Sequence, residues 1–217
     1  MVKVINHLES LGVKTAYREI IITENPGECP TLDPEQEAWK HASEYTLENL
    51  AEHPRIKSYR KTLWSFKIDP TKTRPSPEAL LRRLLRTHRF PRVNCAVDMV
   101  NLASLKYIVC IGLYDADKLP SDTIEVKLAE GGEEFHPIGG KPYKIKQGTP
   151  IAVSGDTVIH LYPSRDSMET SVDHSSSHLT AIAYGHIGDD PSVLRDSLSY
   201  YRELLHKCGC LAVKHDS

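Results

Sequence analysis

The chain has 217 residues, of which 40% are hydrophobic and 26% are charged. Its 27 lysines and arginines are balanced by 29 aspartates and glutamates, and the formal charge of −2 excludes a strongly basic, histone-like binder of nucleic acid. This length supports one substantial core, so we expect a single unit over residues 1–217. The opening residues lack the apolar run of a signal peptide, and no stretch reaches the roughly 18 apolar residues of a membrane span. We therefore expect a cytoplasmic protein that makes no membrane contact.

The first half of the chain, to about residue 106, is predicted to be mostly helical. Ser76 and Pro77 form a start signal, in which Ser76 caps free amides and Pro77 takes the first helical position, where its missing N–H costs nothing. In a later helix, Asp98 and Asn101 are three residues apart and fall on one face. The predicted elements are an opening strand at 17–22 and helices at 34–52, from 76 onward and at 97–105.

The second half is predicted to be a sheet, because from residue 107 the apolar period changes from about 3.6 to about 2. Asp190 and Pro191 then start a closing helix at 190–207. Helices first, then strands to about 188, then a covering helix indicate an α+β fold with a mainly antiparallel or mixed sheet. The predicted strands are 107–112, 124–128, 150–153, 156–162 and 179–186, with glycine turns at 131–132, 139–140 and 155.

The segment 72–92 is strongly basic, with Glu78 as its one acidic residue. Arginines one turn apart on a helix can follow a phosphate backbone, which makes this segment a candidate RNA-binding surface. The same pattern is also typical of a solvated helix face. The candidate residues are Arg74, Arg82, Arg83, Arg86, Arg89 and Arg92.

The five cysteines are odd in number and include no CxxC pair, so we expect reduced thiols that mostly fill the core. Cys208 and Cys210 lie near a C-terminus expected to fray, where a redox role has little support. His174 and His178 have a spacing that suits a metal only in a helix, and the three serines between them disfavour one. We expect no metal and no cofactor.

Phosphate-loop glycine motifs, the GxSxG elbow and HExxH are all missing from the sequence, so the common NTPase, serine hydrolase and zincin classes have no support. Two polar segments remain. The turn at 131–135 joins two glycines to two acids, and it is either a ligand-facing turn or a plain polar hairpin. The run from 164 to 178 reads as a long polar loop, and long loops in compact domains are often functional.

The order of several segments resembles the tRNA-editing domain of the phenylalanyl-tRNA synthetase β subunit, and more closely the free-standing proteins built from that domain alone. The resemblance is densest between about residues 74 and 170. It rests on order and spacing together, since each motif by itself is unspecific. The segments are Arg74-Pro75-Ser76-Pro77-Glu78, Pro91-Arg92-Val93-Asn94, Val97-Asp98-Met99-Val100-Asn101-Leu102, Gly112-Leu113-Tyr114-Asp115-Ala116-Asp117-Lys118-Leu119, Gly132-Glu133-Glu134-Phe135 and Ser164-Arg165-Asp166-Ser167.

This resemblance implies a pocket that accepts a wrongly attached amino acid, tyrosine on a phenylalanine tRNA in the synthetase, as a second sieve. The family's glutamate that accepts the phenol matches Glu133, or Glu134 if the register differs by one. Gly112 would lie on the pocket wall, with Asn101 and Asp98 bracing the floor.

The implied chemistry is attack of water on an aminoacyl ester, helped by position and by the neighbouring ribose hydroxyl more than by a side-chain nucleophile. Gly131, Ser167 and Thr170 are candidates for positioning the water or for stabilising the oxyanion. The implied partner is the acceptor end of an aminoacylated tRNA, and no DNA is expected. At 217 residues the synthetase's other modules have no room, which excludes aminoacylation.

The leading hypothesis from the sequence is therefore hydrolysis in trans of a mischarged aminoacyl-tRNA. Two alternatives stay open. One is a tRNA- or RNA-binding module that kept the fold without hydrolysis, and the other is a small-molecule or metal-dependent hydrolase on the same fold.

Overall fold

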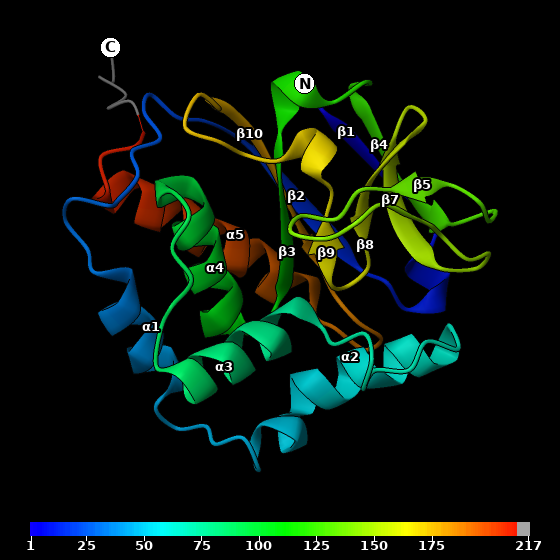
Figure 1. The fold of residues 1–217 in the computed structure, drawn as a ribbon, viewed down its shortest axis with the longest axis horizontal. Coiled ribbons are helices and arrows are strands. Elements are labelled where there is room, and N and C mark those ends of the chain that lie inside the picture. Colours follow the sequence, from blue (N-terminus) through cyan, green and yellow to red (C-terminus); the bar gives the residue numbers. More distant parts are fainter. Residues whose placement is uncertain (212–217) are drawn as a thin grey trace.

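A computed structural model describes residues 1–211 and confirms the α+β fold, with the helices of the first half followed by strands and a C-terminal helix (Figure 1). The helices are α1 (Pro34–Ala42), α2 (Pro54–Ser65), α3 (Ser76–Thr87), α4 (Cys95–Tyr107) and α5 (Pro191–Lys207). The strands are β1 (Lys3–Asn6), β2 (Thr15–Ile21), β3 (Cys110–Asp115), β4 (Thr123–Leu128), β5 (Glu134–Phe135), β6 (Tyr143–Lys144), β7 (Pro150–Ser154), β8 (Thr157–Leu161), β9 (Arg165–Asp166) and β10 (His178–Tyr184).

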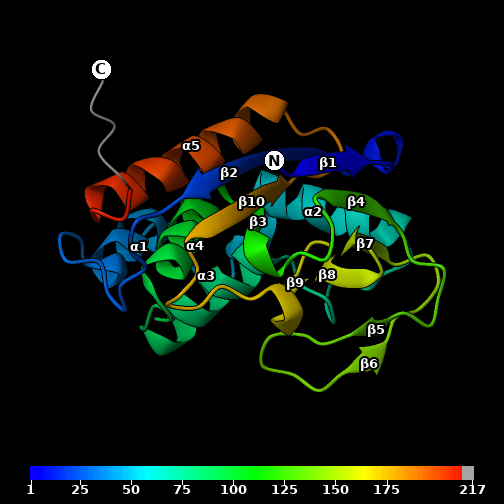
Figure 2. The same cartoon turned by 90° about the horizontal axis from the view of Figure 1, so that it is seen from above.

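The strands form two main sheets and one small hairpin. The larger sheet has the order β1-β4-β7-β8-β9, in which β1 and β4 are parallel and the other pairs are antiparallel. The second sheet is antiparallel, with β10 between β2 and β3. The β5–β6 hairpin lies on the opposite side of the molecule from α5 (Figure 2). The sheet is therefore mixed, as the sequence predicts.

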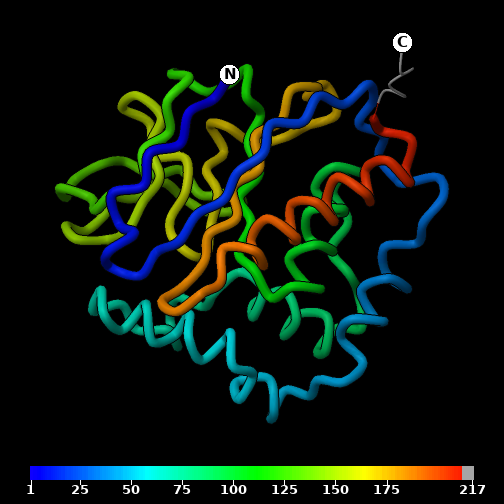
Figure 3. The backbone as a smooth tube through the Cα atoms, turned by 180° about the vertical axis from the view of Figure 1, so that it is seen from behind, coloured from blue at the N-terminus to red at the C-terminus, as the bar shows by residue number. Residues whose placement is uncertain are grey.

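The helices and the sheets pack on one another through apolar faces, which recur at every second residue in a strand and on one side of a helix. Strand β4 buries Ile124 and Val126 and leaves the residues between them partly exposed, which is the period of 2 of a strand with one buried face. Helix α3 buries Leu81 and Leu84 and exposes Arg83 and Arg86. Helix α5 crosses the back of the molecule (Figure 3) and packs on α4, β2 and β10.

Helix α3 begins against the loop that follows β8. The backbone amide of Ser76 donates to the carbonyl of Pro163 at 2.9 Å. Ser76 is the first helical residue rather than the cap, which is Pro75, and no side chain caps this end. The Ser76 side chain is thus available to face the neighbouring strands.

Several boundaries differ from the sequence predictions. The predicted helix at 34–52 ends at Ala42 and is followed only by a short 3₁₀ turn at Leu50–Glu52. Helix α2 was not predicted, because its buried Ile56, Tyr59 and Leu63 are interrupted by basic residues. Helix α4 runs on to Tyr107, so the following strand starts at Cys110 and not at 107.

The expectation of reduced thiols is wrong for one pair, because Cys29 and Cys208 form a disulfide. Cys208 and Cys210 are also buried rather than placed on a fraying end. Within residues 1–211, none of the helices has the length and apolar character that crossing a membrane requires.

Candidate functional site

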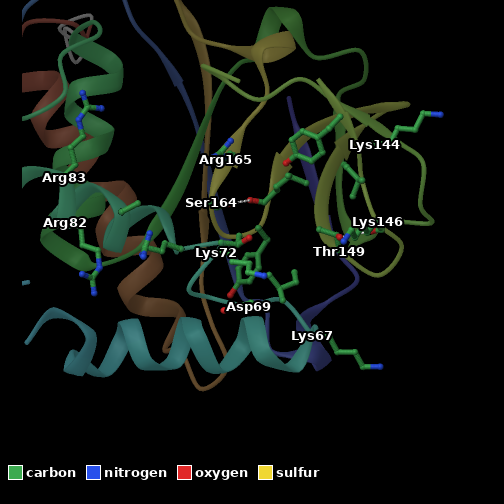
Figure 4. A pocket seen from close by; sticks show the side chains of 18 of the residues that line it. Lys67, Asp69, Lys72, Arg82, Arg83, Lys144, Lys146, Thr149, Ser164 and Arg165 are labelled. Carbon is green, nitrogen blue, oxygen red and sulfur yellow. Dashed lines mark hydrogen bonds between the residues drawn. The ribbon is translucent and has the colours of Figure 1, made fainter. Parts of the chain in front are cut away.

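A groove of about 890 Å³ lies between helix α3 and the β6 region (Figure 4). The 67–74 loop and α3 form one wall, and β6, with the residues that follow it, forms the other. The close view shows Arg82 and Arg83 on one side, Lys144 and Lys146 on the other, and Arg165 between them. This volume falls within the range of about 300–1,000 Å³ that ligand sites usually have.

The groove is strongly basic. Among its lining residues, Asp69 is the one acidic side chain, and its carboxylate accepts hydrogen bonds from the Thr71 backbone amide at 2.9 Å and from the Thr71 hydroxyl at 2.7 Å. These bonds lower the pKa of Asp69, so it stays ionised, but one anion leaves a large surplus of positive charge. The basic lining residues are Lys67, Lys72, Arg74, Arg82, Arg83, Arg86, Lys144, Lys146 and Arg165.

Glu78 organises the arginines beneath this groove. Its buried carboxylate accepts from Arg60 Nε at 3.0 Å and from Arg82 Nε at 2.8 Å. Burial opposes ionisation of Glu78, but the hydrogen bonds and charges of Arg60 and Arg82 outweigh it and lower its pKa. Arg82 is therefore fixed in position, whereas Arg83 and Arg86 extend into solvent.

A second, smaller hollow of about 170 Å³ adjoins the groove, and Ser164 and Arg165 line both. Its lining is mostly polar and comes from α3, α4, β3, β8 and the 164–166 segment. A space of this size holds a small polar group and is too small for a whole nucleotide. The lining residues are Ser76, Leu80, Asn101, Ser104, Ile111, His160, Ser164, Arg165 and Asp166.

His160 and Asp166 form the polar centre of this hollow. The Nδ1 atom of His160 lies 2.7 Å from Asp166 Oδ1, and the Leu113 backbone amide donates to Asp166 Oδ2 at 3.3 Å. The imidazole is buried, stacks on Tyr184 with ring centroids 4.3 Å apart, and has its Nε2 3.8 Å from the Cys110 thiol. Burial raises the pKa of Cys110, which keeps this thiol protonated. Asp166 is therefore the carboxylate that meets the hollow, and His160 orients it.

Gly112 lies directly behind Asp166. A Cβ atom at this position would overlap the Tyr114 hydroxyl and come within 3.0 Å of Asp166 Oδ1. The Tyr114 hydroxyl in turn lies 2.8 Å from the Tyr184 hydroxyl in the core. A side chain at 112 would therefore push against the polar centre of the hollow.

The structure brings part of the sequence-predicted set together at these two hollows. Asn101 lines the small hollow, and four of the predicted arginines line the groove: Arg74, Arg82, Arg83 and Arg86. Arg89 lines neither. Arg92 and Asp98 pair with each other, with Nε 2.7 Å from Oδ2, and Asp98 also accepts from the Val93 amide at 2.9 Å. Burial of Asp98 outweighs these bonds and raises its pKa.

The predicted residues of the 131–135 turn lie outside both hollows. The Glu133 carboxylate accepts from the backbone amides of Glu130 at 2.6 Å and of Gly131 at 2.8 Å, so it closes its own turn. These bonds outweigh desolvation and lower its pKa. Glu134 is exposed and lies 3.4 Å from His136.

Ser167 and Thr170 are buried beside the short 3₁₀ turn at Met168–Thr170. The Ser167 hydroxyl donates to the His136 carbonyl at 3.3 Å and accepts from the Glu169 amide, which uses it as a cap. The Thr170 hydroxyl is buried without a hydrogen-bond partner in the described part of the chain. Neither lines the groove or the hollow.

Sequence reasoning missed His160, Lys144 and Lys146, and it treated Asp166 only as part of a motif. The position of His160 could have been anticipated, because it lies in the strand predicted at 156–162. His174 and His178 do not converge: His174 contacts the Asn25 carbonyl, and His178 lies between Glu19 and Asp117.

The sequence of the chain matches one protein family and several curated proteins. Residues 58–197 match the model of the B3/4 domain. The chain is 27% identical over 201 residues to the phenylalanine–tRNA ligase beta subunit of Synechococcus sp. strain JA-2-3B'a(2-13), covering 88% of this chain and 23% of that protein. It is 26% identical over 123 residues to the same subunit from Staphylococcus saprophyticus, covering 57% of this chain and 15% of that protein.

Among solved structures, an N-terminal fragment of the phenylalanyl-tRNA synthetase beta subunit from Pyrococcus horikoshii matches with a TM-score of 0.45 and 20% identity. That match covers 53% of this chain and 41% of the other. The chain thus spans about a quarter of the length of the first of the curated relatives it matches.

Proposed function

The chain belongs to the B3/4 domain family, and from this premise we propose that it hydrolyses the ester of a mischarged aminoacyl-tRNA in trans. Its relatives carry the same region within a much longer phenylalanine–tRNA ligase subunit, where the B3/4 domain is associated with editing. The observation that carries the proposal is that the groove and the hollow share two lining residues. A basic groove suited to phosphates adjoins, at Ser164 and Arg165, a small polar hollow suited to an aminoacyl group.

In this proposal the groove holds the RNA backbone of the acceptor end. Arg83 and Arg86 project from α3 and Lys146 lies on the opposite wall, so phosphates between them meet cations on both sides. Arg82 is fixed by Glu78 and supplies a pre-oriented guanidinium, which costs less entropy on binding than a free side chain.

The aminoacyl group then lies in the hollow, where Asp166 accepts the α-ammonium group that every aminoacyl-tRNA carries. His160 and the Leu113 amide hold this carboxylate in place. Arg165, at the junction of the two hollows, lies where it can donate to the ester carbonyl. Water adds to the acyl carbon, the bond from that carbon to the ribose oxygen breaks, and the ribose oxygen takes a proton. Between these two steps, in the tetrahedral intermediate, negative charge on the former carbonyl oxygen is stabilised by donors such as Arg165.

The lining of the hollow favours a small polar amino acid over tyrosine. Its volume of about 170 Å³ and its serine, asparagine, histidine and aspartate side chains suit a hydroxyl or amide more than an aromatic ring. Glu133, assigned to the phenol by the sequence hypothesis, is engaged by its own turn. We therefore expect the preferred substrate to differ from tyrosyl-tRNA.

The direct experiment is a deacylation screen with purified protein and a panel of tRNAs charged with seryl, threonyl, alanyl, asparaginyl, tyrosyl and phenylalanyl groups. We expect hydrolysis of one or more small polar esters that is lost in Asp166→Asn and kept in Glu133→Ala. Selective hydrolysis of the tyrosyl ester that depends on Glu133 would favour the sequence hypothesis instead. Salt-dependent tRNA binding without hydrolysis of any ester would leave a binding module and remove the catalytic proposal.

A further inference from the structure

Four of the five cysteines converge at one corner of the molecule, far from the groove. Cys29 lies in the loop before α1, Cys95 is the first residue of α4, and Cys208 and Cys210 follow α5. Figure 3 shows the end of α5 beside the loop that precedes α1. The four are between 0% and 8% exposed, so the cluster is sealed from solvent.

Three of the four sulfur atoms form one group, and the fourth lies beside it against Cys95. The Sγ atoms of Cys29, Cys95 and Cys208 all lie within 4.8 Å of one another, and Cys29 and Cys208 are joined as a disulfide. The fourth sulfur, of Cys210, lies 3.0 Å from Cys95 and is not bonded to it. Cys95 is therefore close to every other member of the group.

Four thiolates around one centre are the ligand set of a closed structural zinc site. In a tetrahedron with Zn–S bonds of about 2.3 Å, neighbouring sulfurs are about 3.8 Å apart. The three sulfurs of Cys29, Cys95 and Cys208 lie within 4.8 Å of one another, and Cys210, now 3.0 Å from Cys95, would shift toward Cys29 and Cys208 to complete the set. The Met99 thioether, 3.5 Å from Cys208, adds a soft and polarisable neighbour.

We propose that Cys29, Cys95, Cys208 and Cys210 bind one Zn²⁺ ion when reduced, and that the Cys29–Cys208 disulfide is the metal-free oxidised form of the same site. A dithiol reductant supplies two electrons and two protons to the disulfide, giving two thiols and becoming a disulfide itself. Zinc then displaces the four thiol protons as it binds the four sulfurs.

The site would fasten the 23–31 segment to the C-terminal end of the described chain. The Cys210 carbonyl already accepts from the Thr23 amide at 2.8 Å, and the Lys207 carbonyl accepts from the Thr31 hydroxyl at 2.5 Å. A metal held by Cys95 as well would tie both segments to α4, so zinc binding would stabilise the whole helical layer. This role is independent of the proposed hydrolysis.

The test is to purify the full chain in a dithiol reductant without chelator and to measure zinc by elemental analysis. We expect about one zinc per chain, and retention at least tenfold lower in Cys95→Ser. The matched control is Cys110→Ser, because Cys110 is equally buried but lies beside His160, outside the cluster. This control should retain zinc at the wild-type level.

A second measurement uses wild-type protein, so its result does not depend on whether the Cys95→Ser variant folds. Co²⁺ added to reduced wild-type protein should give the sulfur-to-metal charge-transfer and tetrahedral ligand-field bands of a four-thiolate site, with an end point of one equivalent. Wild-type protein that holds no zinc and shows no such bands overturns the proposal. So does reduced protein whose intact mass still shows the Cys29–Cys208 disulfide, or equal zinc in the Cys95→Ser and Cys110→Ser variants.

Discussion

The basic groove and the cysteine corner differ in how far their functional side chains are exposed to solvent. In the groove, Arg83 and Arg86 are exposed and uncompensated, and the ionic contacts lie beneath them at Glu78. At the corner, the cysteine sulfurs face one another and exclude water. Exposed positive charge is accessible to a binding partner. Buried sulfur atoms can contact only other residues of the chain or an ion enclosed among them.

The largest effect is expected from Glu78→Ala, which tests whether the buried Glu78 carboxylate stabilises the wall of the groove. Removing it leaves Arg60 and Arg82 without their shared partner, and we expect a loss of about 3 kcal/mol in the free energy of unfolding. Chemical denaturation measures this loss. Glu9→Ala removes an exposed carboxylate paired with Lys14 and should change stability by less than about 0.5 kcal/mol. Equal effects of the two substitutions would show that the buried network carries no special weight.

The same residue sets a pH dependence. The folded-state pKa of Glu78 is lowered, so its contribution is fully present above its unfolded value of 4.5 and is lost as pH falls through the folded pKa. Stability measured from pH 7 to pH 3 should therefore decline less steeply in Glu78→Gln than in the wild type. A decline of the same slope would contradict the assignment.

Asp166→Asn is expected to have the next largest effect, and it separates the hollow from the groove. The amide keeps the shape but removes the charge that we assign to the α-ammonium group, so deacylation should fall about 100-fold. Binding of uncharged tRNA should stay within about twofold, because the groove is untouched. Asp156→Asn, in the exposed β7–β8 turn, is the control. A variant that loses binding and hydrolysis together would contradict the division of roles.

Gly112→Ala probes how tightly the hollow is packed. The new methyl group would overlap the Tyr114 hydroxyl and press on Asp166, at a cost of about 2 kcal/mol in thermal or chemical unfolding. At Gly27 an added Cβ would make only an ordinary contact, 3.7 Å from His174, so Gly27→Ala should be close to neutral. If both variants are equally stable, the core behind Asp166 is looser than the contacts indicate.

The smallest effect should come from single groove cations. Arg83→Ala removes one phosphate contact, so tRNA binding should weaken about threefold to tenfold and the slope of log K against log salt should become shallower by about 0.7–0.9. Arg195→Ala, exposed on α5 at the back of the molecule, should change neither quantity. The same weakening in both variants would mean that overall charge, and not the groove, attracts RNA.

The sequence predicted the elements whose signals are local. The spacing of Arg82, Arg83 and Arg86 placed them on one helix, and alternation in 124–128 identified β4. It did not reveal the pairing of His160 with Asp166, because that contact depends on how β8 and β9 meet in the sheet.

The cysteine cluster is even harder to predict from the sequence than the contact between His160 and Asp166. Cys29 and Cys208 are 179 positions apart, and Cys95 comes from a third segment, so no spacing rule connects them. The expectation of no metal followed from motifs within short windows. The proposed ligand set comes from a loop, a helix start and the segment after α5, and such windows cannot detect that combination.

The hydrogen bond from the Ser76 amide to the Pro163 carbonyl fastens the first turn of α3 to the segment just before Ser164 and Arg165. One wall of the groove and the border of the hollow are thereby joined by a backbone contact, in addition to the packing of α3 on α4 and β3. If the groove binds an RNA end as proposed, a displacement of α3 would therefore change the groove and the position of Ser164 and Arg165 together.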